Sequence, residues 1–300
     1  MKSCKANLQR VLQSLFLTCS LTATTAGATQ TADEIMTRVD FTARKSFSTE
    51  LARVKITTCK YAVQNGAVKC TEKPRVVVAE GAKKLYRADG QYSDKVVSIV
   101  SEPISDKGTS LLTYEYGERG RDNDNWFYLP ALAKVNRVIA NDEEGGSIFG
   151  SEFSVDTIEN PEARKIHEYT YDLVEESSVD GRPAWVIEIL PTAEKAKRTD
   201  YDKVVVWIDK EYHIALKEDL YRGGKLHKQR TQSGIKKVDG VFVATKIVMN
   251  NRSRSRISQM DRNPVRLNTE IPDEFFTQRA LTDFSFKERH LASFRAELDQ

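Results

Sequence analysis

The sequence predicts a mainly β protein: a single curled antiparallel sheet of about eleven strands, a half-barrel, with a few helices covering a hydrophobic cavity. From residue 48 onward, apolar and polar residues alternate with the period of a strand. Turn pairs such as Asp89-Gly90 and Asp180-Gly181 fall between most of these short segments, as in an antiparallel meander. Helical patterns are few. A sheet this large curls when it is open, and curled antiparallel sheets enclose ligand cavities.

The first 28 residues have the features of an export signal. Lys2, Lys5 and Arg10 precede the apolar run VLQSLFLTCSL, and Ala26-Gly27-Ala28 supplies a cleavage site of small residues. The run is too short and too polar to span a bilayer. We therefore expect residues 1–28 to be a cleaved signal peptide; the alternative is a retained N-terminal anchor.

Charge excludes one class of partner. The chain has 46 Lys and Arg against 43 Asp and Glu. Removal of the signal peptide takes three basic residues and no acidic ones, so the mature chain is balanced. Such a balance lacks the basic footprint that nucleic-acid binding needs, and no nucleic-acid partner is predicted.

Helices are expected at four places. Thr31 and Glu34 form a capping box before an amphipathic helix, and further helices are predicted at 151–159, 192–199 and 287–298. The compact half-barrel domain is predicted to span residues 29–285. Residues 286–300 form a C-terminal helical tail whose apolar stripe is read mainly as packing on its own domain, with docking of a partner as the alternative.

The two remaining cysteines bracket a hairpin. Asn65-Gly66 is the pair that type I′ turns prefer, and it lies midway between Cys59 and Cys70. A turn at this pair places residue 61 opposite residue 70, so facing thiols would need a register shift of about two residues. Export implies an oxidising compartment, and we predict a Cys59–Cys70 disulfide. A metal site is disfavoured because no histidine is near.

Signals of catalysis are weak. GGSIFG resembles a nucleophile elbow at Ser147, but Phe149 stands where the second glycine belongs. The four histidines are scattered singly, without the spacing of metal ligands. No catalytic residue, metal or cofactor is predicted; a lipid-modifying hydrolase at Ser147 is the weakest of the hypotheses.

One segment departs from the strand pattern: DNWFYLPALAKVNRVIANDEEGGSIFGSEFSVDTIE, residues 124–159. Its aromatics either plug the end of the curled sheet or line the mouth or floor of a cavity for an apolar ligand, with the glycines giving a mobile lid. Periodicity does not separate the two readings. On the second reading, the ligand-binding residues are Trp126, Tyr128, Leu129, Ile148, Phe149 and Phe153.

The order of motifs in this segment resembles the bacterial outer-membrane lipoprotein-sorting protein family, periplasmic relatives of LolA and LolB. The matching residues are Trp126, Tyr128-Leu129-Pro130, Lys134 to Ile139, Gly146-Ser147 with Phe149, Gly150-Ser151-Glu152-Phe153, and Asp156 to Glu159. Weaker matches at 201–229, 239–251 and 271–281 extend the resemblance over roughly 31–285. The basic cluster after Tyr-Leu-Pro is thinned to Lys134 and Arg137, and Ile148 separates Ser147 from Phe149.

The resemblance implies a LolA/LolB-like half-barrel closed by helices over a hydrophobic cavity. It implies a periplasmic carrier without catalysis for a lipid or an acylated lipoprotein, moving to or from the outer membrane. It also implies a possible partner, an inner-membrane exporter of the resistance-nodulation-division (RND) type, and only peripheral or transient membrane contact. The alternative function is an envelope assembly or adaptor protein that binds a protein partner through the half-barrel.

A basic segment, Arg252-Ser253-Arg254-Ser255-Arg256, is a further candidate binding site. On a strand, Arg252, Arg254 and Arg256 share one face. They are candidates for contact with anionic headgroups or an acidic partner. The competing reading, which we favour, is a charged outer face that prevents edge-to-edge pairing.

Overall fold

The computed structural model describes residues 30–88, 91–138, 147–154 and 165–300. Residues Thr31–Gln300 form one compact unit. The predicted signal peptide, the glycines Gly145 and Gly146 of the predicted lid, and most of the helix predicted at 151–159 lie outside the described residues. Ser151 to Ser154, the described part of that helix, are not helical, so the prediction is wrong there.

Fourteen described strands form one open antiparallel sheet, which confirms the predicted class and corrects the predicted number of about eleven. The hairpin stub β2 and the short edge strands β6 and β7 are all paired into this sheet. The strands are β1 (Thr49–Gln64), β2 (Ala67–Cys70), β3 (Arg75–Ala88), β4 (Gln91–Glu102), β5 (Ser110–Tyr116), β6 (Asp124–Leu129), β7 (Lys134–Val138), β8 (Tyr169–Val179), β9 (Arg182–Pro191), β10 (Lys203–Asp209), β11 (Ala215–Arg222), β12 (Lys225–Val238), β13 (Val241–Asn251) and β14 (Arg256–Leu267).

The described helices are few, as expected. They are α1 (Ala32–Arg44), α3 (Gln278–Thr282), α4 (Phe284–Leu298) and the short 3-10 helices η1 (Pro130–Leu132), η2 (Ile166–Glu168), η3 (Lys195–Lys197) and η4 (Asp273–Phe275). The capping box at Thr31 and Glu34 is present, with both of its reciprocal hydrogen bonds. The helix predicted at 192–199 shortens to η3.

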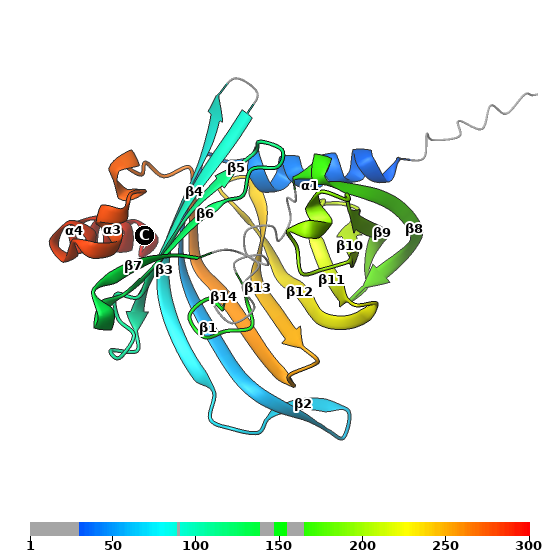
Figure 1. Cartoon of the computed structure of the whole chain (residues 1–300), viewed down its shortest axis with the longest axis horizontal. Coiled ribbons are helices and arrows are strands. Elements are labelled where there is room, and N and C mark those ends of the chain that lie inside the picture. Colours follow the sequence, from blue (N-terminus) through cyan, green and yellow to red (C-terminus); the bar gives the residue numbers. More distant parts are fainter. Residues whose placement is uncertain (1–29, 89–90, 139–146, 155–164) are drawn as a thin grey trace, which may run out of the picture. The chain divides into compact units, whose positions relative to one another are not determined.

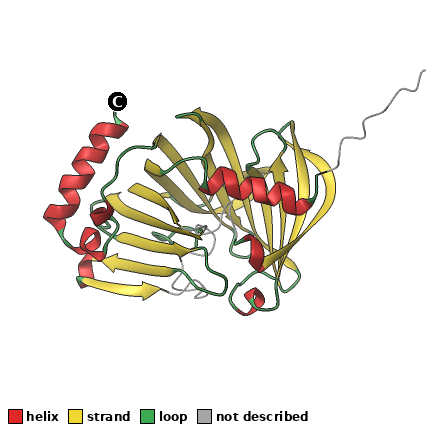
Figure 2. Ribbon diagram, turned by 90° about the horizontal axis from the view of Figure 1, so that it is seen from above, coloured by secondary structure: helices red, strands yellow, loops and turns green. Residues whose placement is uncertain are grey.

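The sheet is built from its middle outward. Its order is β7-β6-β5-β4-β3-β1-β14-β13-β12-β11-β10-β9-β8, with β2 paired to β1. The chain therefore enters at the centre, reaches one edge at β7, continues to the opposite edge at β8, and returns to the centre at β14. Because strands twist, a sheet of this width curves strongly, as Figures 1 and 2 show. The connection from β7 to β8 joins the two edges of the sheet, and we call residues 147–154 of this connection the crossover segment.

The two faces of the sheet carry different layers. The inner face packs against α1 and the crossover segment, whereas the outer face of β3–β7 packs against α3 and α4 (Figure 1). Neighbouring residues show the alternation: Leu111 belongs to the inner cluster and Leu112 to the outer one. The tail residues Leu291, Phe294 and Leu298 are buried in the outer cluster, which confirms that their stripe packs on its own domain.

The predicted disulfide is present. Cys59 and Cys70 are joined, with Cα atoms 5.7 Å apart, at the base of the Asn65-Gly66 turn. Both turn residues have positive φ, as a type I′ turn requires. Tyr61 lies opposite Cys70, so the register shift of two residues did not occur. The bond joins a diagonal pair instead, which the spacing of the Cα atoms permits.

Candidate functional site

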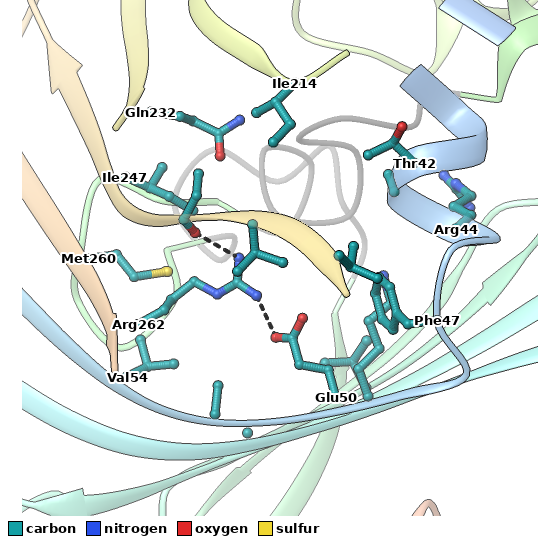
Figure 3. Close-up of a pocket in the computed structure, with 18 of the residues that line it drawn as sticks. Thr42, Arg44, Phe47, Glu50, Val54, Ile214, Gln232, Ile247, Met260 and Arg262 are labelled. Atoms are coloured by element: carbon teal, nitrogen blue, oxygen red, sulfur yellow. Dashed lines mark hydrogen bonds and ion pairs between the residues drawn. The ribbon is translucent and has the colours of Figure 1, made fainter. Parts of the chain in front are cut away.

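The inner face holds a cavity of about 210 Å³. Its walls come from the last turn of α1 and Phe47, from β1, β3 and β4, from β12, β13 and β14, and from Phe153 of the crossover segment. Figure 3 shows Val54, Ile247 and Met260 on one side and Thr42, Arg44 and Phe47 on the other. Most of the lining side chains are apolar, so the cavity suits an apolar occupant.

One ion pair lies across the cavity wall. Nη2 of Arg262 donates to Oε1 of Glu50 at 2.6 Å, and Nη1 donates to the carbonyl of Ala244 at 3.3 Å (Figure 3). Glu50 is on β1 and Arg262 on β14, two neighbouring strands. Two charged groups therefore lie in a mainly apolar wall, and each offsets the cost of burying the other.

A second pair is more deeply buried. Glu218 and Arg230 are opposite each other on β11 and β12, and both are 2% exposed. The guanidinium donates from Nη2 to Oε1 at 2.9 Å and from Nε to Oε2 at 3.2 Å. Beside it lies Gln232, whose Nε2 donates to the carbonyl of Ala215 at 2.8 Å. Arg230 and Gln232 both reach the cavity wall.

The end of α1 adds a buried charge cluster. Arg44 contacts Asp40 at 3.3 Å, Glu115 at 3.6 Å and Asp94 at 3.9 Å. Arg87 donates to the other oxygen of Asp94 at 2.8 Å. Burial raises the pKa of Glu115, and the neighbouring Lys83 and Arg44 only partly offset this effect.

The crossover segment is fastened to the sheet through Glu152, which is 6% exposed. Its two carboxylate oxygens accept hydrogen bonds at 2.7 Å from Arg256 and from Asn251. Its backbone N–H donates to the hydroxyl of Ser258, and its carbonyl accepts from Lys228. Three strands thus hold the segment in place.

Apolar contacts complete this attachment. Ile148, Phe149 and Phe153 are buried in the inner cluster, and Phe149 lies 6.1 Å from the ring of Phe127. Gly150 has a φ of +74°, and a Cβ there would meet the guanidinium of Arg75 at 3.0 Å. Phe153 is the member of this group that also lines the cavity.

The six predicted ligand-binding residues fall on both faces of the sheet. Trp126 and Tyr128 point to the outer face, where Trp126 packs edge-on against Tyr114 at 4.9 Å. Neither they, Leu129, Ile148 nor Phe149 line the inner cavity. The three consecutive aromatic residues occur because both faces of this strand pack against other parts of the protein. Phe127 packs on the inner face, whereas Trp126 and Tyr128 pack on the outer face. Ligand contact by the six residues stays a prediction.

Tyr128 instead lines a second cavity of about 250 Å³ on the outer face, beside α4. Lys287 of α4 also lines it, is 4% exposed, and donates to the carbonyl of Leu281 at 3.2 Å. Burial lowers the pKa of this lysine. Sequence reasoning gave no sign of Lys287, because it lies within a charged helical tail.

The basic segment at 252–256 does not lie on one strand. Residues 252–255 form the turn between β13 and β14, and Ser255 has a φ of +48°, so the predicted shared face is wrong. A turn forms because β13 and β14 pair as a hairpin at this point. Arg256 is committed to Glu152, while Arg252 and Arg254 are exposed.

The described ranges show the surroundings of Ser147 and of the side chains of metal-binding types. They contain no group of His, Cys, Asp or Glu side chains placed to hold a metal ion. Ser147 donates its hydroxyl hydrogen to the carbonyl of Ser151 at 2.7 Å. Within the same ranges, no helix has the length and apolar character needed to cross a membrane.

A curled open antiparallel sheet, an inner-face helix and an apolar cavity are the features of a LolA/LolB-like fold. A family model described as "Uncharacterized protein" matches residues 92–283, well over half of the chain, and the chain belongs to that family. No curated protein matches it in sequence.

Solved structures agree on the fold. A DUF1329 family protein from Desulfovibrio piger has a TM-score of 0.73 at 24% identity, over 83% of this chain and 97% of its own. A domain assigned as an outer membrane lipoprotein-sorting protein, from Vibrio parahaemolyticus, has a TM-score of 0.71 at 22% identity, over 84% and 98%. A LolA superfamily protein from Nitrosomonas europaea has a TM-score of 0.59 at 18% identity, over 83% and 98%. These structures confirm the LolA/LolB-like fold that the sequence motifs indicated.

Several cavity residues escaped sequence reasoning. They lie on four strands in two distant parts of the chain: Glu50 and Lys83 on β1 and β3, and Gln232 and Arg262 on β12 and β14. Each sits in a strand where charged residues are common on solvated faces, so composition gave no signal. The one available signal was a polar or charged residue at a strand position where the alternation of apolar and polar residues predicts an inward-facing side chain.

Proposed function

We propose that this protein is a non-catalytic carrier or binding protein of the bacterial envelope, which shelters an acyl chain of a lipid or lipidated protein in the inner cavity. One observation carries the proposal: an apolar cavity of about 210 Å³ between α1, the crossover segment and the sheet. An apolar void of about 150 Å³ binds benzene. By that ratio the cavity accommodates roughly eight or nine heavy atoms, a stretch of one acyl chain.

The expected affinity suits a carrier. Eight methylenes removed from water contribute about 6 kcal/mol at ~0.8 kcal/mol each. That gain corresponds to a dissociation constant of tens of micromolar before ordering costs are subtracted. A ligand held this strongly is protected from water yet can still be released to an acceptor.

The finer parts of the proposal rest on the sequence. The signal peptide supports export and cleavage after Ala28, and with the LolA/LolB-like fold it supports a periplasmic location. Passage to or from the outer membrane, with an inner-membrane RND-type exporter as partner, extends the proposal to a pathway. Arg252 and Arg254, exposed in the β13–β14 turn, are the candidates for transient contact with anionic headgroups.

Native extraction followed by lipid mass spectrometry tests the function. The full chain is expressed with its own signal, purified from the envelope without detergent, and its bound lipids are extracted. We expect acyl-chain lipid at a substantial fraction of the protein concentration. Co-purification of a protein with no lipid would favour the adaptor function instead.

A matched pair of variants links any lipid to the cavity. Val54 lines the cavity, whereas Val174 on β8 is 60% exposed. Val54→Phe fills part of the space and is expected to reduce the bound lipid severalfold. Val174→Phe makes the same chemical change outside the cavity and is expected to leave the lipid unchanged. Equal lipid in both variants would place the binding site elsewhere.

A further inference from the structure

Lys83 adds a positive charge to the wall of the inner cavity. Lys83 on β3 lies directly opposite Glu50 on β1, and both line the cavity. Glu50 is already paired with Arg262 at 2.6 Å. These three side chains therefore leave one positive charge at the wall, and that charge belongs to Lys83.

Lys83 has no hydrogen bond or ion pair with any residue in the described ranges. It attracts the carboxyl of Glu115, but Glu115 lies in the Arg44 cluster, which has its own cations. Burial raises the pKa of Glu115, so this carboxyl group is less readily ionised and is a weaker counter-ion for Lys83. A half-buried ammonium beside apolar side chains is costly to keep without an anion of its own, and the two carboxylates near Lys83, those of Glu50 and Glu115, each also face an arginine.

A second wall residue also points to an occupant. Gln232 is 5% exposed, and its amide orientation is fixed by the bond from Nε2 to Ala215. Its Oε1 has no hydrogen-bond partner in the part of the chain that the structure describes. Figure 3 shows this oxygen turned toward the space beside Arg262. Buried polar atoms are nearly always paired, and this oxygen can only accept, so it calls for a hydrogen-bond donor on the ligand. A polar head group that carries both an anionic group for Lys83 and a donor for Gln232 accounts for both side chains.

The size of the cavity limits the ligand to one chain. Room for roughly eight or nine heavy atoms cannot hold the three acyl chains of a mature lipoprotein anchor. We propose that the inner cavity binds a single-chain lipid with its anionic head inside, and that Lys83 is the counter-ion. This inference rests on the proposed carrier function and narrows it from lipids in general to anionic single-chain amphiphiles.

Two probes with the same acyl chain isolate the charge. Octanoate carries a carboxylate, and methyl octanoate is its neutral counterpart. Neither donates a hydrogen bond, so Gln232 does not discriminate between them. Calorimetric titration into the purified, delipidated full mature chain measures both affinities. We expect octanoate to bind about ten- to a hundredfold more tightly, the range of a hydrogen bond to a charged group.

Variants of Lys83 assign the difference to its ammonium group. Lys83→Met is expected to lower the octanoate affinity to about the level of methyl octanoate, with a much smaller effect on the affinity for methyl octanoate, which loses a neutral hydrogen bond at most. Lys83→Arg keeps the charge and is expected to retain most of the preference. Lys55→Met makes the same change at an exposed position of β1 and serves as the control. Thermal melts of all variants verify that the fold persists.

The outcomes separate the two proposals. If both probes bind equally and Lys83→Met changes neither affinity, the inference is overturned while the carrier function stands. If neither probe binds and native extracts contain no lipid, the carrier function fails and the inference fails with it. A preference for octanoate that Lys83→Met removes and Lys55→Met does not would support the inference.

Discussion

The buried pair of Glu218 and Arg230 allows the sharpest test of how this sheet tolerates charge on its inner face. Both side chains are almost fully enclosed, at 3% and 2% exposed, and they meet in a two-point contact. Glu218→Gln keeps the shape and removes the negative charge, so the guanidinium of Arg230 is left buried without its main counter-charge. Breaking a buried pair in this way costs about 3–5 kcal/mol of the free energy of unfolding.

Removing both charges should cost far less. In Glu218→Leu with Arg230→Met, no uncompensated ion remains, and the desolvation of two charged groups is avoided. Replacing buried pairs by apolar residues of similar volume is often neutral or stabilising. We expect the double variant to lie within about 1 kcal/mol of the wild type. A double-mutant cycle that measures Glu218→Leu and Arg230→Met singly and together should then show a coupling of about 3 kcal/mol or more.

Urea unfolding followed by circular dichroism measures these free energies. Glu176→Gln is the control, because Glu176 pairs with Lys210 at 2.6 Å but its side chain is 64% exposed. Exposed pairs contribute at most about 1 kcal/mol. If Glu218→Gln destabilised the protein no more than Glu176→Gln does, desolvation would not govern the energetics of this face, and the charge argument for Lys83 would lose its basis.

Three further outcomes are expected. Glu152→Gln loses the ionic hydrogen bond to Arg256. This change should lower the free energy of unfolding, measured by urea titration, by about 1–3 kcal/mol. An unchanged free energy would mean that Glu152 does not hold the crossover segment in place. Burial depresses the pKa of Lys287, so between that pKa and about 10.5 the unfolded chain binds more protons than the folded one. The free energy of unfolding should rise with pH over this range, and the rise should be smaller in Lys287→Met; burial also lowers the pKa of Lys165, which keeps part of the rise. Replacing Arg252 and Arg254 by Ser should weaken binding to anionic vesicles by up to about thirtyfold, at ~1 kcal/mol per arginine, without altering the melting temperature. If the variant bound vesicles as well as the wild type, the two arginines would be a charged turn that does not contact membranes.

The crossover segment combines the two readings of the aromatic motif. Ile148 and Phe149 act as a plug, because they are buried in the core of the inner face. Phe153, a few residues on, is both core and cavity wall. The segment is therefore built into the fold and also forms one side of the proposed ligand site. A substitution at Phe153 should affect stability and ligand binding together, whereas one at Val54 acts mainly on binding.

Local patterns in the sequence determined much of the fold. The period-two alternation and the turn pairs predict the strands, because each strand buries one side and each turn needs residues that adopt its backbone angles. The capping box at Thr31 and the Asn65-Gly66 turn depend only on neighbours in the chain, and both are confirmed. The Cys59–Cys70 disulfide follows from the same hairpin.

Tertiary structure alone decided the site. Alternation shows that Trp126 and Phe127 face opposite ways, but it does not say which face is covered by α1 and which by α4. The placement of β1 at the centre, and of the crossover segment between the edges, depends on contacts across more than a hundred residues. Lys83, Glu50 and Arg262 became neighbours through that pairing. The net positive charge of these three side chains arises only when the strands bring them together, so no single segment of the sequence reveals it.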